Sequence, residues 1–337
     1  MKAAIIENKK IIIKDIEKPT LKQEGALIKV LGCGLCGSDI VKFQHNIAKN
    51  GAVLGHEIIG EIIEINTNTE FKVGDKIAMG HHYPCFKCVY CKGENYSMCD
   101  TFKKSNIIPG GFAEYIAIDE NHLKHTVFKV PNNLENYEAS FMEPLSCCIR
   151  AVRRAELKPN SKVLVIGLGS IGLLMGQALK AFGHEVIGVD LSQKRLEIAQ
   201  NHNFDLVIQS SQQVEITANE IKLKTQKEGV DAVFMTSGSE KTFELCLKSI
   251  RNGGTILIFS SVPSETAGFI NNDIYYRELK ILGSYSPAPQ DIKQAIKFLE
   301  TGKVKVKNLS TEYQLNQVQQ AIEDTITHKI YKAYIKI

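Results

Sequence analysis

The first third of the chain contains short apolar runs separated by polar segments that contain glycine. These runs lie at 26–31, 57–66 and 76–79 and are rich in Ile, Val and Ala. Short apolar runs bounded by turn-forming residues are typical of strands. The pattern predicts an all-β, barrel-like unit with long functional loops.

The pattern changes from about residue 146. Apolar runs at 163–166, 185–189, 231–235 and 255–259 have the character of buried strands, and segments with helical spacing, such as 172–182 and 194–201, separate them. Strands that alternate with helices predict a parallel, doubly wound sheet. The tail from about residue 286 has a helical segment at 291–301 and a strand-like end at 332–337, and its pattern does not say which domain it joins.

Length and composition limit the classes of partner. A chain of 337 residues, 44% of them hydrophobic, can bury the cores of about two domains. Its net charge of +4 includes no basic block, which argues against nucleic acid as the main partner. The most apolar window, 163–179, contains four glycines and is shorter than the roughly 20 apolar residues of a membrane span. The N-terminal residues carry charges and lack an apolar signal core, so we expect a cytoplasmic protein without a membrane partner.

Four of the nine cysteines lie in one polar loop with the spacing C-x2-C-x2-C-x7-C. They are Cys85, Cys88, Cys91 and Cys99. Four thiolates complete a closed tetrahedral shell around one Zn²⁺, which leaves no position for chemistry. Such a site stabilises a loop that lacks a core of its own. Two disulfides or free thiols are the alternatives, and the lack of a secretory signal favours structural zinc.

A second set of metal-ligand residues comes from three separate segments. Cys36 lies in Gly-Leu-Cys-Gly-Ser-Asp, His56 and Glu57 in Gly-His-Glu, and Glu143 in Glu-Pro-Leu-Ser. A thiolate, an imidazole and a carboxylate form a mixed shell with an open position, which distinguishes a catalytic zinc from a structural one. Taken singly, a buried Cys or His is more often a packing residue, so the value of this set lies in the motifs around it.

Two other features have less specific interpretations. Cys33 and Cys36 form a C-x-x-C pair, but no βαβ pattern surrounds it, so a thioredoxin-type redox site is disfavoured. His81 and His82 border the four-cysteine loop, where we expect a loop or cleft-rim position instead of metal ligation.

A glycine motif follows the apolar run at 163–166 and opens a helical segment. It reads Gly167-Leu168-Gly169-Ser170-Ile171-Gly172. In this context the glycines permit a tight turn, close approach of the backbone to a pyrophosphate and close packing of helix on strand. A diphosphate then meets the positive N-terminal end of the helix.

An acidic residue stands where such a nucleotide site requires one. Asp190 closes the second strand of this half and would accept hydrogen bonds from the ribose hydroxyls of adenosine. A 2′-phosphate would be repelled by this carboxylate, so NAD is favoured over NADP, although Arg195 could turn toward a phosphate. The segments Ser237-Gly238 and Ser260–Pro263 follow later strands and would line the same crevice.

The motifs occur in the order found in one family. The Cys36 segment, Gly-His-Glu, the four-cysteine loop, Glu-Pro-Leu-Ser and the glycine motif together resemble the zinc-containing medium-chain dehydrogenase/reductase (alcohol dehydrogenase) family over essentially the whole chain. The resemblance implies a GroES-like catalytic domain at 1–145 with a structural zinc lobe at 80–100. It further implies a Rossmann NAD-binding domain at 146–285 and a C-terminal segment, 286–337, that returns to the catalytic domain.

The resemblance also implies roles for single residues. Cys36 and His56 would bind the catalytic zinc, with Glu57 or Glu143 as the carboxylate ligand, so the chain would carry two zinc ions. Asp39 would hold the His56 ring in the correct tautomer. Ser38 would pass the substrate proton outward. Many relatives complete this relay with a histidine where the chain has Val41, so His45, or the cofactor ribose and water, would have to replace it.

The implied reaction is hydride transfer between NAD and a secondary alcohol or polyol. Glu143-Pro-Leu-Ser and the later Arg153-Arg154 pair resemble the polyol (sorbitol) branch, whereas residues 283–287 lack the Arg-Tyr pair of polyol enzymes. An L-threonine 3-dehydrogenase and a sugar-phosphate or cyclitol dehydrogenase remain alternatives, as does a non-enzymatic zinc and nucleotide-binding sensor or scaffold. Analogy with relatives suggests a homodimer or homotetramer.

Overall fold

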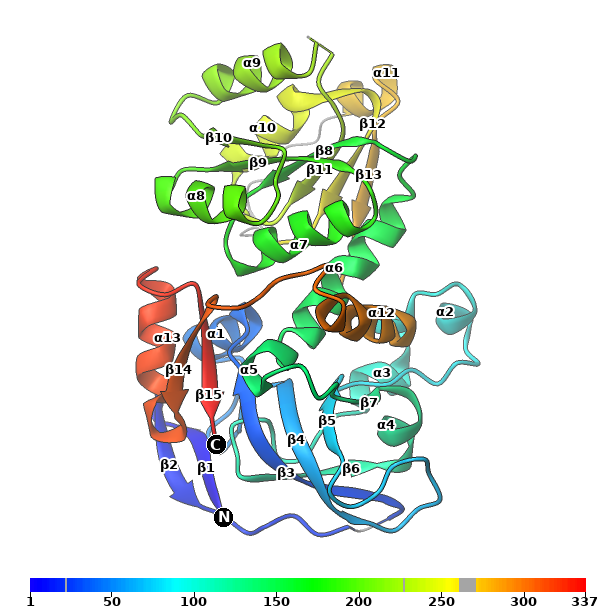
Figure 1. Cartoon of the computed structure of the whole chain (residues 1–337), viewed down its shortest axis with the longest axis vertical. Coiled ribbons are helices and arrows are strands. Elements are labelled where there is room, and N and C mark those ends of the chain that lie inside the picture. The colour runs from blue at the N-terminus through cyan, green and yellow to red at the C-terminus, as the bar shows by residue number, and fades with distance from the viewer. Residues whose placement is uncertain (22, 227, 261–270) are drawn as a thin grey trace. The chain divides into compact units, whose positions relative to one another are not determined.

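The computed structural model describes residues 1–21, 23–226, 228–260 and 271–337. It divides into two compact units (Figure 1). The first unit comprises Met1–Ser146, Pro287–Gly302 and Val306–Ile337, and the second comprises Cys147–Ser286 and Lys303–Lys305. Among the described residues, no helix has the length and apolar character needed to cross a membrane.

The first unit contains a two-stranded hairpin and a seven-stranded mixed sheet. The order in the larger sheet is β14-β15-β3-β4-β5-β7, and β6 also pairs with β3. The strands are β1 (Lys2–Glu7), β2 (Lys10–Asp15), β3 (Gly25–Gly34), β4 (Glu57–Ile65), β5 (Lys76–Met79), β6 (Tyr115–Asp119), β7 (Val127–Lys129), β14 (Ser310–Gln314) and β15 (Lys332–Lys336). The strands predicted in the first third are therefore confirmed as β3, β4 and β5.

Short helices occupy the connections of this sheet. They are α1 (Gly37–Gln44), α2 (Val89–Lys92), α3 (Asp100–Lys104), α4 (Glu120–His125), α5 (Asn136–Ala139), α12 (Pro289–Glu300) and α13 (Val318–Ile326), with 3₁₀ turns η1 (Tyr96–Met98) and η2 (Leu315–Gln317). Helix α6 (Met142–Ala155) begins in the first unit and ends in the second. The helical segment predicted at 291–301 is confirmed as α12.

The register of three strands brings distant parts of the chain together. In the antiparallel pair β3–β4, Gly34 lies opposite Glu57. Strand β15 pairs antiparallel with the same end of β3, with Tyr334 opposite Gly34. A Cβ atom at Gly34 would lie 1.9 Å from Oε2 of Glu57, so only glycine fits there. Residues from the end of β3, the start of β4 and the C-terminal strand therefore meet at one place.

The second unit is built around six parallel strands in the order β10-β9-β8-β11-β12-β13. The strands are β8 (Lys162–Ile166), β9 (Glu185–Asp190), β10 (Leu206–Gln209), β11 (Val230–Met235), β12 (Ile250–Ile258) and β13 (Lys280–Gly283). The helices are α7 (Ser170–Ala181), α8 (Gln193–Asn201), α9 (Val214–Lys224), α10 (Glu240–Ser249) and α11 (Asn271–Tyr276).

Helices lie on both faces of this sheet, α7 and α8 on one and α9 and α10 on the other (Figure 1). The predicted doubly wound sheet is confirmed. Its core contains fully buried side chains from the central strands, such as Leu164, Val233 and Ile256. The strand order reverses between β8 and β11, and in such sheets a ligand crevice forms at the carboxyl ends of the strands at this point.

Candidate functional site

Three predicted metal-ligand residues lie together in the first unit. Cys36 directly precedes α1, His56 directly precedes β4, and Glu57 is the first residue of β4. The Sγ atom of Cys36, a ring nitrogen of His56 and a carboxylate oxygen of Glu57 all lie within 4.8 Å of one another. The antiparallel pairing of β3 with β4 brings about this convergence, because it places the end of one strand beside the start of the other.

Asp39 fixes both segments that carry these residues. Its carboxylate accepts N–H groups of Cys36 and Gly55, each at 3.2 Å, and Oδ1 lies 3.3 Å from Nδ1 of His56. Burial raises the pKa of Asp39, but the facing imidazole and the N–H donors outweigh it and lower that pKa overall. The contact occupies Nδ1 of the ring and leaves Nε2 available as a ligand atom, as expected for a residue that orients a metal-binding histidine.

Both carboxylate oxygens of Glu57 are buried and make no hydrogen bond among the described residues, and one of them is in an ion pair. Oε2 forms an ion pair of 2.6 Å with Nζ of Lys332, and both side chains are buried. The buried Oε1 has no hydrogen-bond partner among the described residues. A thiol, an imidazole nitrogen and an orphaned carboxylate oxygen are the donor set that zinc prefers, so these residues fit a zinc ion.

Glu143 takes a different place from Glu57. It is buried in the first turn of α6 and does not belong to the group of ligand atoms within 4.8 Å. Burial lowers the pKa of Lys332, but the charge of Glu57 raises it, and the result is a raised pKa. The charge of Glu143 makes a smaller contribution in the same direction. Of the two carboxylates predicted as alternatives, Glu57 is the one that lies in the cluster.

Two residues at this site had no assigned role in the sequence prediction. Lys332 comes from the C-terminal strand, and no local motif links it to Glu57. The ring of His81 lies with its centre 4.6 Å from that of His56, although the sequence indicated only a rim position. Ser38 lies exposed in the first turn of α1, and Val41 and His45 are also exposed on this helix or at its end.

The four-cysteine lobe forms a second cluster in the same unit. The sulfur atoms of Cys85, Cys88, Cys91 and Cys99 lie within 4.8 Å of one another, and none is in a disulfide. Burial and the neighbouring sulfurs of Cys88 and Cys99 raise the pKa of Cys91 to about 12. Burial also raises the pKa of Cys99, but backbone N–H groups of Cys85 and Phe102 lower it to about 6. A shared cation would stabilise the thiolate form of all four groups at this separation, so the cluster fits a closed zinc site.

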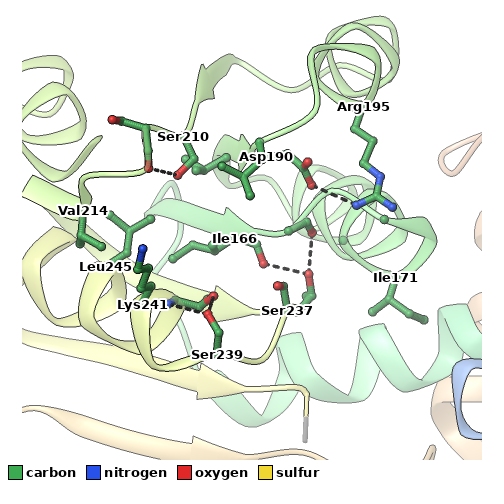
Figure 2. Close-up of a pocket in the computed structure, with 18 of the residues that line it drawn as sticks. Ile166, Ile171, Asp190, Arg195, Ser210, Val214, Ser237, Ser239, Lys241 and Leu245 are labelled. Atoms are coloured by element: carbon green, nitrogen blue, oxygen red, sulfur yellow. Dashed lines mark hydrogen bonds and ion pairs between the residues drawn. The ribbon is translucent and has the colours of Figure 1, made fainter. Parts of the chain in front are cut away.

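The glycine motif lies where β8 ends and α7 begins. Gly167 has a φ of +91°, which favours glycine, and a Cβ at Gly172 would lie 1.8 Å from the carbonyl oxygen of Gly167. A Cβ at Gly169 would meet nothing within 4 Å, because this residue borders open space. The motif lines a cavity of about 420 Å³ that also includes Ser170, Ile171, Asp190 and Arg195 (Figure 2).

Asp190 is buried at the carboxyl end of β9. Its carboxylate accepts N–H groups of Leu168 at 2.7 Å and Ser192 at 2.8 Å, and Oδ2 lies 3.6 Å from Nη1 of Arg195. Figure 2 shows the Arg195 side chain turned toward the neighbouring Asp190 carboxylate. The carboxylate therefore holds the glycine loop and presents a negative charge to a ligand.

Other residues of the cavity were not predicted. Ser210, Ser211 and Gln212 follow the short strand β10, and Lys241 and Thr242 lie in the first turn of α10. Ligands contact the carboxyl ends of parallel strands, so recognition of β10 in the sequence would have predicted the three residues that follow it. Ser237 lines the cavity as predicted, whereas most of the predicted segment 260–263 lies outside the described residues.

Comparisons with known proteins agree with this geometry. Residues 22–132 match the family model of the alcohol dehydrogenase GroES-like domain, and residues 170–301 match that of zinc-binding dehydrogenases. The sorbitol dehydrogenase of Bacillus subtilis (strain 168) is 33% identical over 341 residues, which cover 98% of this chain and 94% of the relative.

Two solved structures of dehydrogenases are also similar to this chain over its whole length. The 2R,3R-butanediol dehydrogenase of Bacillus subtilis has a TM-score of 0.86 and 26% identity, covering 100% of this chain and 99% of that one. A protein of Sinorhizobium meliloti 1021, described as a zinc-binding dehydrogenase and solved with NADP, has a TM-score of 0.89 and 25% identity with the same coverage.

The two clusters predict the metal content of the protein. We expect two zinc ions per chain, one for each group of ligand atoms, and about one after Cys85→Ala because the closed site loses a thiolate. Elemental analysis of the purified protein measures this directly. Cys246→Ala, which removes a buried thiol that belongs to neither group of ligand atoms, is the control and should retain both ions. A wild-type protein with a single zinc would contradict the assignment.

The environment of Asp190 predicts a change in cofactor preference. Asp190→Ala should weaken NAD binding by roughly 10–100-fold, because hydrogen bonds to a charged group are lost. NADP should lose less, since repulsion of its 2′-phosphate disappears and Arg195 is released. Titration of both cofactors gives the ratio of dissociation constants. Asp231→Ala removes a carboxylate that pairs with Arg251 instead, and should leave this ratio unchanged. An unchanged ratio in Asp190→Ala would refute the role of Asp190.

Proposed function

This chain belongs to the zinc-binding alcohol dehydrogenase family, and from this premise we propose that it is a cytoplasmic, NAD-linked enzyme that oxidises a secondary alcohol or polyol to the ketone. As a member of this family, the protein is an oxidoreductase that acts on alcohols. The family uses zinc and a nicotinamide dinucleotide. The uncrosslinked thiols of the lobe support a reducing compartment.

The cluster of Cys36, His56 and Glu57 is the observation that carries this proposal. A zinc ion held by these side chains would supply Lewis acidity to a substrate hydroxyl. Asp39 keeps the thiol and imidazole segments in place, and Lys332 keeps the carboxylate beside them. We propose that residues 1–145, with the lobe at 80–100, form the catalytic domain and that 286–337 complete it.

Ser38 is our candidate to take the proton of the substrate hydroxyl. It lies exposed two residues after Cys36, in the first turn of α1. Val41 provides no further proton acceptor, so we propose that either His45, or the cofactor ribose together with water, takes the proton from Ser38 to solvent. The reaction balances when the carbinol carbon gives a hydride to C4 of the nicotinamide and its hydroxyl gives a proton to solvent.

The cavity of the second unit supports NAD as the cofactor. We propose that residues 146–285 bind it, with the pyrophosphate over Gly167–Gly172 backbone and the adenosine ribose on Asp190. The side chain of Arg195 is turned toward Asp190, whose carboxylate partly offsets the charge of the guanidinium group. Arg195 therefore attracts a 2′-phosphate less strongly. NAD is therefore favoured over NADP.

The test is a panel of substrates with NAD reduction followed by absorbance. It includes polyols, simple secondary alcohols, L-threonine, a cyclitol and a sugar phosphate, so that each alternative substrate class has a representative. We expect polyols or secondary alcohols to be oxidised fastest. Cys36→Ser should abolish turnover and Asp39→Asn should lower it by about 10–100-fold, both with unchanged NAD affinity. Activity retained in Cys36→Ser would refute the metal-dependent mechanism, and Cys246→Ala should remain active.

We also propose that the protein forms a homodimer or a homotetramer. Strand β13 is at the edge of the parallel sheet, and among the described residues its outer side pairs with no other strand. Tyr275 and Tyr276 lie exposed just before it, with 71% and 76% of their surface accessible. Open strand edges favour pairing with a second copy. Sedimentation equilibrium should give two or four chains per particle, and a monomer at micromolar concentration would contradict this proposal.

A further inference from the structure

The glycine loop between β8 and α7 is hydrogen-bonded to residues that end the two neighbouring strands of the sheet. On the side of β9, the carboxylate of Asp190 accepts the N–H of Leu168 at 2.7 Å. On the side of β11, the hydroxyl of Thr236 donates to the carbonyl oxygen of Gly167 at 2.6 Å. Strand β8 lies between β9 and β11, so the loop that follows it is held from both sides.

These two hydrogen bonds act on the two ends of one peptide group. The carbonyl of Gly167 and the N–H of Leu168 belong to the same planar unit, so they can only turn together. Oγ1 of Thr236 binds one end of this unit and Oδ2 of Asp190 binds the other. The orientation of the peptide is therefore fixed, although it follows a glycine with a φ of +91° and thus a residue with wide conformational freedom.

The contacts of Thr236 show which carbonyl its hydroxyl serves. The backbone N–H of Thr236 donates to the carbonyl oxygen of Ile166 at 3.1 Å, and the hydroxyl lies 3.0 Å from the same oxygen. A hydroxyl has a single proton to donate, and the shorter contact, with Gly167, receives it. A Cβ at Gly172 would lie 3.0 Å from Oγ1, so the first turn of α7 also packs close to this hydroxyl.

The orientation of this peptide determines the course of the backbone into α7. Gly169 is the N-cap of the helix and Ser170 its first residue. The first N–H groups of a helix have no partner within it and attract anions, provided that they point at the ligand. A turn of the Gly167–Leu168 peptide would redirect the backbone at Gly169 and misalign these donors.

We propose that Thr236 is a positioning residue of the nucleotide site, whose hydroxyl locks the Gly167–Leu168 peptide so that the N–H groups at the start of α7 face the pyrophosphate. This inference rests on the proposed function, because it takes the ligand of the cavity to be a dinucleotide. Thr236 directly follows β11 and lines that cavity. Its hydroxyl proton is used by the loop, so its effect on the ligand is transmitted through the loop.

The experiment compares Thr236→Ala, which removes the hydroxyl, with Thr236→Ser, which keeps it. In the alanine variant the dissociation constants of NAD and ADP should rise by about tenfold, the effect of one lost hydrogen bond. The dissociation constant of adenosine, which carries no phosphate, should stay unchanged. The serine variant should bind all three ligands as the wild type does. Titration calorimetry measures NAD and ADP, and competition with ADP measures adenosine.

Hydrogen exchange of the ligand-free protein, followed by mass spectrometry, gives a second readout. The segment that contains Leu168 should exchange faster in Thr236→Ala than in the wild type or in Thr236→Ser, because one end of its peptide is then released. Thr225→Ala is the matched control, since it removes a buried hydroxyl of the same unit that donates to the carbonyl oxygen of Ile221 at 2.9 Å. It should change neither the nucleotide affinities nor the exchange of the loop.

Three results would overturn this inference and leave the proposed function intact. They are unchanged ADP binding in Thr236→Ala, equal losses of affinity for ADP and adenosine, and a serine variant that binds as weakly as the alanine variant. A wild-type protein that binds neither NAD nor ADP would instead overturn the proposed function together with this inference.

Discussion

The buried carboxylate of Asp39 holds together the two segments from which the metal-binding cluster is built. It accepts N–H groups from Cys36 and Gly55 and contacts the ring of His56, so one side chain sets the separation of a thiol and an imidazole. Its burial would be unfavourable without these partners. Because three polar contacts compensate the charge, Asp39 both stabilises the loop before β4 and selects the ring nitrogen that faces the ligand site.

The second constraint is the ion pair between Glu57 and Lys332. Burying two charges costs free energy, and removal of one partner leaves the other uncompensated. The lysine occupies a single oxygen of the carboxylate, so the other keeps its capacity to bind. Strand β15 thereby contributes to the chemistry of a site whose other members lie near the start of the chain.

The sequence predicted the parts of the site that local motifs specify. The four cysteines have a spacing typical of a zinc site, Cys36 and His56 lie in motifs of the resembled family, and Asp190 stands at the distance from the glycine motif that a strand-turn-helix unit requires. The regular alternation of strands and helices likewise predicted the parallel sheet. These features are determined by residues that lie close together in the sequence, so they can be predicted from the sequence alone.

The remaining features depend on tertiary contacts. Lys332 reaches Glu57 through the pairing of β15 with β3, which no pattern in either segment indicates. The choice between Glu57 and Glu143 follows from strand register, and the contact between the rings of His81 and His56 depends on how β4 and β5 pair. Strand β10 is too short for its apolar period to be distinctive, so the polar residues after it were missed as well.

The pairing of β15 with β3 has a consequence for synthesis of the protein. Strand β3 leaves the ribosome long before its partner β15, which follows it in the chain by about 300 residues. The parallel sheet is encoded almost entirely between these two strands, and domains generally fold as units during translation. The second unit can therefore reach its native state while the first still lacks Lys332, and Glu57 acquires its counter-charge only after the parallel sheet has been synthesised.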